Sequence, residues 1–175
     1  MASHPAPDCD SPSAVLPADE LSQIGFLLGR AYYSYIGFLE CLLGQTGLGE
    51  HIKPGMGSLL FALFREDDRT ISDLARELQL ARSTMTGMVA RMKKAGLITV
   101  VKCAADSRAM RLRLTPLARS LEPRCHDLAQ RVERLLTRDL EASQSEELRK
   151  ALSVVIRTIN DQVRLQSRQK AKATP

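Results

Sequence analysis

The segment AMRLRLT, residues 109–115, alternates apolar side chains with arginines. Such alternation indicates a β-strand with one buried and one exposed face, because successive side chains of a strand point to opposite sides. An apolar run precedes it at residues 97–102, and the polar link CAADSR joins the two. The sequence therefore predicts a β-hairpin of these two strands, anchored by Met110, Leu112 and Leu114.

Two helices are predicted directly before this hairpin. Thr70 and Asp73 form a Thr-x-x-Asp helix start, close to a capping box, for a short helix through Leu78. After a turn, ARSTMTG opens a further helix over about residues 82–95, which Gly96 stops. The order helix, turn, helix and hairpin is that of a winged helix-turn-helix. The side chains expected in its core are Ile71, Leu74, Ala75, Leu78, Met85, Val89 and Met92.

The chain before this region predicts two more helices. The first begins at Asp19 and ends in GQTGLGE, where three glycines interrupt the pattern. Pro54 suits the first turn of the second, whose apolar run follows it. The first helix carries an apolar stripe of Leu21, Ile24, Leu28, Tyr32, Tyr35, Leu39 and Leu42.

Two long helices are predicted after the hairpin. Thr115–Pro116, an N-cap followed by proline, opens a helix to about Asp139. Ser143 and Glu146 form a capping box for a last helix through about Gln166. The apolar stripes of the two helices are Leu117, Leu121, Leu128, Val132 and Leu135, then Leu148, Leu152, Val155, Ile159 and Val163.

These patterns predict a mainly α-helical protein with one small β-hairpin. Residues 1–18 are rich in Pro, Ser and Ala without an apolar period, so we expect a disordered leader. The winged helix-turn-helix region is expected at 53–115, and a helical region at 19–52 and 116–168. The polar and basic end, residues 169–175, is expected to fray.

The basic charge is concentrated in one part of the chain. The net charge is +5, yet residues 81–113 hold eight lysines and arginines against one carboxylate, Asp106. A concentrated basic block is typical of proteins that bind polyanions. Together with the winged architecture it predicts binding to nucleic acid. The alternative is a winged-helix module that binds protein or RNA, and the basic hairpin favours DNA.

Several classes of function lack support in the sequence. No window of eighteen apolar residues and no secretory signal appears, so we expect a cytoplasmic protein without a membrane span. No Gly-rich phosphate loop, Ser-His-Asp constellation or pair of catalytic carboxylates is present either. We therefore expect no enzyme activity and no cofactor.

The cysteines do not have the spacing of a metal site. Cys9, Cys41, Cys103 and Cys125 are scattered, and the adjacent pair Cys125–His126 would point about 100° apart on a helix. We expect no metal. Cys9, Cys41 and Cys103 are candidates for a thiol sensor, although inert small side chains are the favoured interpretation.

The segments TISDLARELQLARSTMTGMVARMKKAGLI and DSRAMRLRLTPLA resemble the DNA-binding lobe of the MarR family of bacterial transcription regulators. The resemblance extends over about residues 20–168. It implies a homodimer held by the first helix and the last two, which binds a palindromic DNA operator. Three amphipathic helices that need apolar partners outside the winged region support this independently. The matching positions are Leu74, Ala75, Ser83, Thr84, Thr86, Lys93, Lys94, Gly96 to Ile98, Asp106, Arg108, Leu114 and Thr115.

The resemblance also implies roles for single residues. Arg108 at the tip of the wing would enter the minor groove, and Asp106 would brace that loop. Apart from the resemblance, the alternation of the strand places Arg111 and Arg113 on its outer face, near the phosphates. The helix that begins at Arg82 would lie in the major groove. The full set of predicted DNA-binding residues is Arg82, Ser83, Thr84, Thr86, Arg91, Lys102, Asp106, Arg108, Arg111 and Arg113.

The sequence departs from the family pattern at four positions. Gly87 replaces a frequent basic residue, Val100 replaces an arginine, and Cys103 replaces an acidic residue. Gly25 stands where the peroxide-sensing branch has its reactive cysteine, so that mechanism is not expected.

A small aromatic or phenolic effector is a further partner that the resemblance implies. Tyr32, Tyr35 and His51 are the candidates for its pocket. Tyrosines on an apolar helical stripe are more often core residues, and that interpretation stays open here.

Overall fold

The computed structural model describes residues 23–102 and 109–173. None of the described helices combines the length and the apolar character that crossing a membrane requires. The chain divides into two units, residues 1–38 and 39–175, and each is described by itself.

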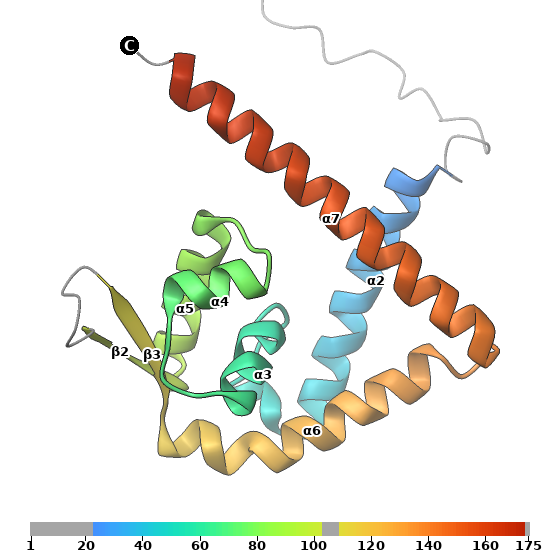
Figure 1. The fold of residues 1–175 in the computed structure, drawn as a ribbon. Coiled ribbons are helices and arrows are strands. Elements are labelled where there is room, and N and C mark those ends of the chain that lie inside the picture. The colour runs from blue at the N-terminus through green and yellow to red at the C-terminus, as the bar shows by residue number, and fades with distance from the viewer. Residues whose placement is uncertain (1–22, 103–108, 174–175) are drawn as a thin grey trace, which may run out of the picture. The chain divides into compact units, whose positions relative to one another are not determined.

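The described chain is mainly helical and has one small sheet (Figure 1), as the sequence predicts. Its elements are α2 (Ile24–Gln45), the 3-10 turn η1 (Leu48–Glu50), α3 (Gly57–Arg65), β1 (Arg69–Thr70), α4 (Ile71–Glu77), α5 (Arg82–Lys94), β2 (Ile98–Lys102), β3 (Met110–Leu114), α6 (Pro116–Leu136) and α7 (Ala142–Ala173).

The sheet has three antiparallel strands in the order β1-β3-β2. The predicted hairpin pairs Ile98 with Leu114 and Lys102 with Met110. The additional strand β1 pairs Arg69 with Leu112 on the other side of β3. Two residues are too few to show an alternating pattern, so β1 can be recognised only from its pairing with β3 in the folded chain.

The core of the winged region forms around β3. Leu112, at the centre of β3, is completely buried, and α3, α4 and α6 all contact this strand. The helix α5 packs against β2 (Figure 1) and buries Met85, Met88 and Met92. Two of these methionines confirm the predicted core, but the prediction for Val89 is only half right because this residue is half-buried.

Two threonines begin helices as the sequence predicts. The side chain of Thr70 accepts a hydrogen bond from the backbone N–H of Asp73 at the start of α4. Thr115 does the same for the N–H of Ala118 at the start of α6, with proline at the next position. Gly96, at φ 71°, follows the end of α5 in the left-handed conformation that favours glycine.

Two predicted helix starts are wrong. Pro54 lies in a turn with Gly55 at φ 84°, a conformation outside the helical region, and α3 begins later with Met56 as its N-cap. The expected capping box of Ser143 does not form, because α7 already begins at Ala142. There the side chain of Gln144 accepts a hydrogen bond from the backbone N–H of Glu141 at 2.9 Å.

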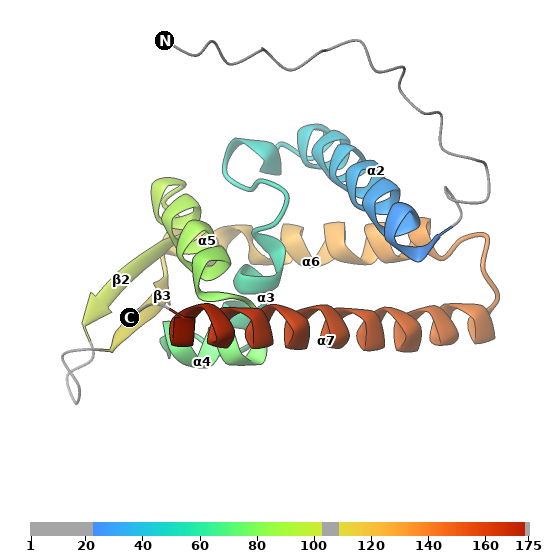
Figure 2. The same ribbon diagram turned by 90° about the horizontal axis from the view of Figure 1, so that it is seen from above.

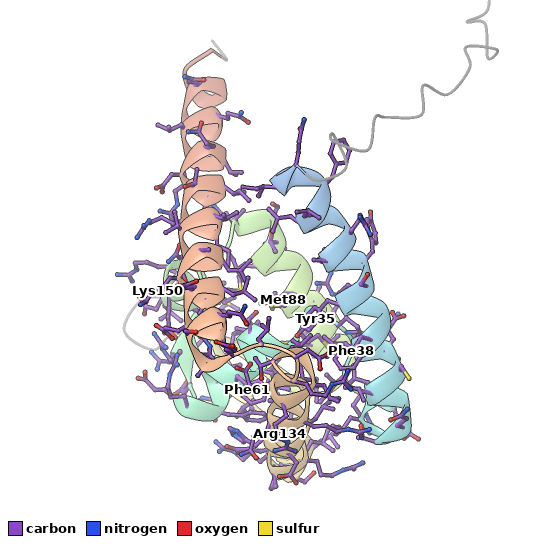
Figure 3. All side chains as sticks on the ribbon, turned by 90° about the vertical axis from the view of Figure 1, so that its right-hand side faces the viewer. Tyr35, Phe38, Phe61, Met88, Arg134 and Lys150 are labelled. Carbon is purple, nitrogen blue, oxygen red and sulfur yellow. The ribbon has the colours of Figure 1, made fainter. Side chains whose placement is uncertain are left out.

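The two long helices differ in how much of their apolar stripe they bury: α6 buries Leu121, Leu128 and Val132, whereas α7 leaves most of its stripe exposed. α7 forms one uninterrupted helix (Figure 2), and side chains project from both of its sides in Figure 3. Val155 is half-buried, while Leu148, Leu152, Ile159 and Val163 are exposed by 39 to 50%. Leu135 on α6 is also exposed. Within residues 23–102 and 109–173 these side chains stay exposed to solvent, so their full burial requires a further surface.

We expect Thr115→Ala to lower the free energy of unfolding by about 1–2 kcal/mol, the usual loss for a helix N-cap. Its hydroxyl also donates to the carbonyl of Gly96 at 2.7 Å, which ties α6 to the end of α5. Denaturant unfolding measures the change. Thr137→Ala is the control, because its hydroxyl bonds only within the last turn of α6, and a change within about 0.5 kcal/mol is expected. An equal loss in both variants would contradict the capping role.

Two glycine substitutions should act in opposite directions. A Cβ on Gly87, within α5, would meet only the Arg91 guanidinium at 3.5 Å, so Gly87→Ala should raise stability by up to about 1 kcal/mol. Gly96→Ala should lower it, because the backbone there has φ 71°. Thermal unfolding of both variants tests this; destabilisation by Gly87→Ala would contradict the open environment described for this position.

Candidate nucleic-acid interface

The start of α5 presents polar and basic side chains on its exposed face. Arg82, Ser83 and Thr84 are all exposed, and the hydroxyl of Thr86 donates to the carbonyl of Arg82 at 2.8 Å. Ala81 holds the N-cap and has no side-chain oxygen, so no cap side chain accepts from the first-turn amides. No acidic residue lies in this turn. The turn thus offers N–H donors and positive charge, which suits a phosphate.

Packing determines which side of α5 faces outward. Met85, Met88 and Met92 are buried on the side toward the winged core. Arg91 is exposed on the same helix. The apolar side therefore holds the helix in place while its polar start stays accessible.

The predicted wing arginines have an unexpected acidic partner. Arg111 donates from Nε to Oδ1 of Asp68 at 2.9 Å, and its terminal nitrogen bonds to the Asp68 carbonyl. Arg113 donates to Oδ2 of the same carboxylate, also at 2.9 Å. The pairing of both arginines therefore spans 43 and 45 residues along the chain.

These two guanidinium groups hold the pKa of the Asp68 carboxyl at about 2, first through the hydrogen bond from Arg113 and then through that from Arg111. Because the folded pKa lies below the ordinary value of 3.8, the stabilisation is present above that value. It is lost only as the pH falls toward 2. Asp68 is thus ionised at neutral pH.

A second carboxylate, Asp67, fixes the end of the wing. Its Oδ1 accepts from the backbone N–H of Leu114 at 2.9 Å and from that of Asp68 at 2.8 Å. Its other oxygen pairs with Arg119 on α6. Asp67 therefore joins the loop before β1 to the last residue of β3 and to the following helix.

Sequence reasoning missed both aspartates. They lie in the polar segment REDDRT, outside the basic block, and the pattern around them indicates only a break between helices. The pairing of β1 with β3 brings this segment beside Arg111. That pairing has no signature in the sequence.

Of the remaining residues predicted to contact DNA, one belongs to the described part of the chain and two do not. Lys102 is exposed at the end of β2. Asp106 and Arg108, predicted at the tip of the wing, lie outside the described residues. Their roles remain predictions.

The candidate effector residues occur in both units. In the first unit Tyr32 and Tyr35 are exposed, and partial burial raises the pKa of Tyr35 above its usual value. In the second unit His51 is half-buried. A hollow of about 460 Å³ lies nearby, between the end of α2 and Pro54, but His51 is not among its lining residues. A shared pocket remains a prediction.

The two described cysteines differ in environment. Cys41 is exposed, whereas Cys125 is buried in α6, and this burial raises its pKa to about 11. Cys125 is therefore a neutral thiol at physiological pH and a poor nucleophile. Cys9 and Cys103 lie outside the described residues. Within residues 23–102 and 109–173, no group of three potential ligands is placed to hold a metal ion.

Comparison with known proteins relates this geometry to a family. Residues 57–109 match the model of the MarR family. No curated protein sequence matches the chain at a significant level.

Several solved structures share the fold. A probable transcriptional regulator from Pseudomonas aeruginosa is 25% identical with a TM-score of 0.67, covering 77% of this chain and 97% of its own. The PcaV transcriptional regulator from Streptomyces coelicolor, in complex with its natural ligand, is 22% identical with a TM-score of 0.68, covering 79% and 95%. The MepR–DNA complex from S. aureus is 19% identical with a TM-score of 0.65, covering 78% and 98%.

The family match runs from α3 through β2 and ends at residue 109, just before β3, so it includes α5 with its exposed start. The structural matches extend the likeness to most of the chain. The resemblance found in the sequence is therefore confirmed: the winged region of this chain is similar to that of the MarR family of transcription regulators.

Proposed function

We propose that the protein is a transcription regulator that binds double-stranded DNA. The observation that carries the proposal is the start of α5, with exposed Arg82, Ser83 and Thr84, uncapped amides and no acid. These side chains and N–H groups suit the edges of bases and the phosphates along a major groove. The apolar opposite side of the helix presses it onto the rest of the winged region, so the groove would meet a rigid element.

The proposed binding form is a homodimer on a palindromic operator. Large apolar side chains of α7 are exposed in the single chain, among them Ile156 by 53% and Ile159 by 50%. Exposed apolar side chains in this number support association with a second surface. A twofold dimer would present two copies of α5 to half-sites about one DNA turn apart, roughly 34–36 Å.

We further propose that the regulator is a repressor that a small effector releases. The name of the PcaV structure states that this regulator binds a natural ligand, and that of the MepR structure states a DNA complex. The family resemblance of the sequence suggests a small aromatic or phenolic compound as the effector. Tyr32, Tyr35 and His51 remain the residues proposed to contact it.

The proposal predicts that the protein binds the DNA upstream of its own gene with a steep dependence on salt. Each phosphate neutralised contributes a slope of about −0.9 in log affinity against log salt concentration. A dimer with six phosphate contacts would lose about 10³-fold in affinity between 50 and 200 mM salt. Fluorescence anisotropy with labelled duplexes measures the slope. Absence of binding to any palindromic duplex at low salt would overturn the proposal.

The wing is predicted to contribute to operator binding through Arg108. Arg108→Ala should weaken operator binding by about 1–3 kcal/mol and leave the thermal unfolding midpoint unchanged. Arg138→Ala is the matched control, because it removes the same charge from the link between α6 and α7, where Arg138 pairs with its neighbour Asp139. If both variants bind as the parent protein does, Arg108 has no part in recognition.

A further inference from the structure

The carboxylate of Asp68 is held by the two arginines that the sequence assigns to DNA phosphates. Its two oxygens each accept from a different guanidinium, Oδ1 from Arg111 and Oδ2 from Arg113, both at 2.9 Å. Guanidinium groups bind carboxylates and phosphates with the same donor geometry. A DNA phosphate that approaches this position must therefore compete with Asp68.

The two arginines are engaged to different degrees. Arg111 bonds to both the side chain and the carbonyl of Asp68, and its side chain is 32% exposed. Arg113 shows one hydrogen bond to the carboxylate, through one terminal nitrogen, and its side chain is 54% exposed. Arg113 is thus the arginine whose charge would be most readily released toward solvent or DNA.

Other contacts besides the charge of Asp68 hold the root of the wing. Leu112 is completely buried, β1 pairs with β3, and Asp67 accepts from the backbone N–H of Leu114. Asparagine also tolerates the backbone of Asp68, which has φ 54°, because Asn and Asp are enriched in the left-handed region. Replacing the carboxylate by an amide therefore removes a charge and leaves these other contacts in place.

We propose that Asp68 is an internal competitor for DNA that limits the affinity of the wing by occupying Arg111 and Arg113. The inference rests on the proposed function and goes beyond it, since it assigns a role to an acidic residue outside the basic block. Phosphate binding to these arginines is independent of base sequence, so Asp68 would weaken binding to non-operator DNA as much as to the operator. The residue would thereby lower the affinity for both kinds of DNA and leave the ratio of the two affinities unchanged.

The test is Asp68→Asn in the full chain, measured by anisotropy against an operator and a non-operator duplex over a salt series. Each arginine that gains a phosphate adds about 0.9 to the salt slope and, at 100 mM salt, about tenfold in affinity. We expect this gain on both duplexes. Asp139→Asn, the same charge change in the α6–α7 link, is the control and should leave the slope unchanged.

A double variant identifies the arginine that is released. Asp68→Asn combined with Arg113→Gln should return the slope to that of the parent protein, because the freed guanidinium is then absent. An unchanged or shallower slope in Asp68→Asn, with the parent melting temperature, would overturn the inference. If Asp68→Asn unfolds, the carboxylate is a structural requirement and the inference is equally overturned. Failure of the parent protein to bind either duplex at low salt would instead reject the proposed function itself.

Discussion

The burial of Leu112 is the contact on which the winged region depends. This side chain is 0% exposed, lies at the centre of the middle strand, and occupies the region where α3, α4 and α6 meet β3. Because side chains of a strand alternate, burying Leu112 directs the neighbouring Arg111 and Arg113 to the other face. The same packing positions β2 against α5 and hence the outward face of that helix. One apolar contact thus determines where the basic groups lie.

The charges on the outward faces are not equivalent. At the start of α5, Arg82 is exposed beside amides that no cap residue satisfies, so its positive charge is available to an external anion. At the root of the wing, the charge of Arg113 is shared with Asp68. The start of α5 therefore presents accessible hydrogen-bond donors, whereas the positive charge of Arg113 on β3 is partly neutralised by Asp68.

Local patterns in the sequence predicted the elements that local chemistry determines. The alternation around Leu112, the cap at Thr115 and the stop at Gly96 all appear in the structure as expected. Features that depend on distant segments were missed, above all the pairing of β1 and the position of Asp68 beside wing arginines more than 40 residues away. The apolar stripe of α7 is largely exposed among the described residues of the single chain. A pattern shows that a face is apolar but does not identify what covers it.

The central claim is that two chains act together on one DNA duplex. Sedimentation velocity of the protein mixed with a fluorescently labelled operator duplex tests it directly, because the mass of the labelled species gives the stoichiometry. We expect a free protein of twice the 19.4 kDa chain mass and a complex of two chains with one duplex. A monomer that binds the duplex one to one, or a dimer that leaves the duplex unbound at low salt, would contradict it.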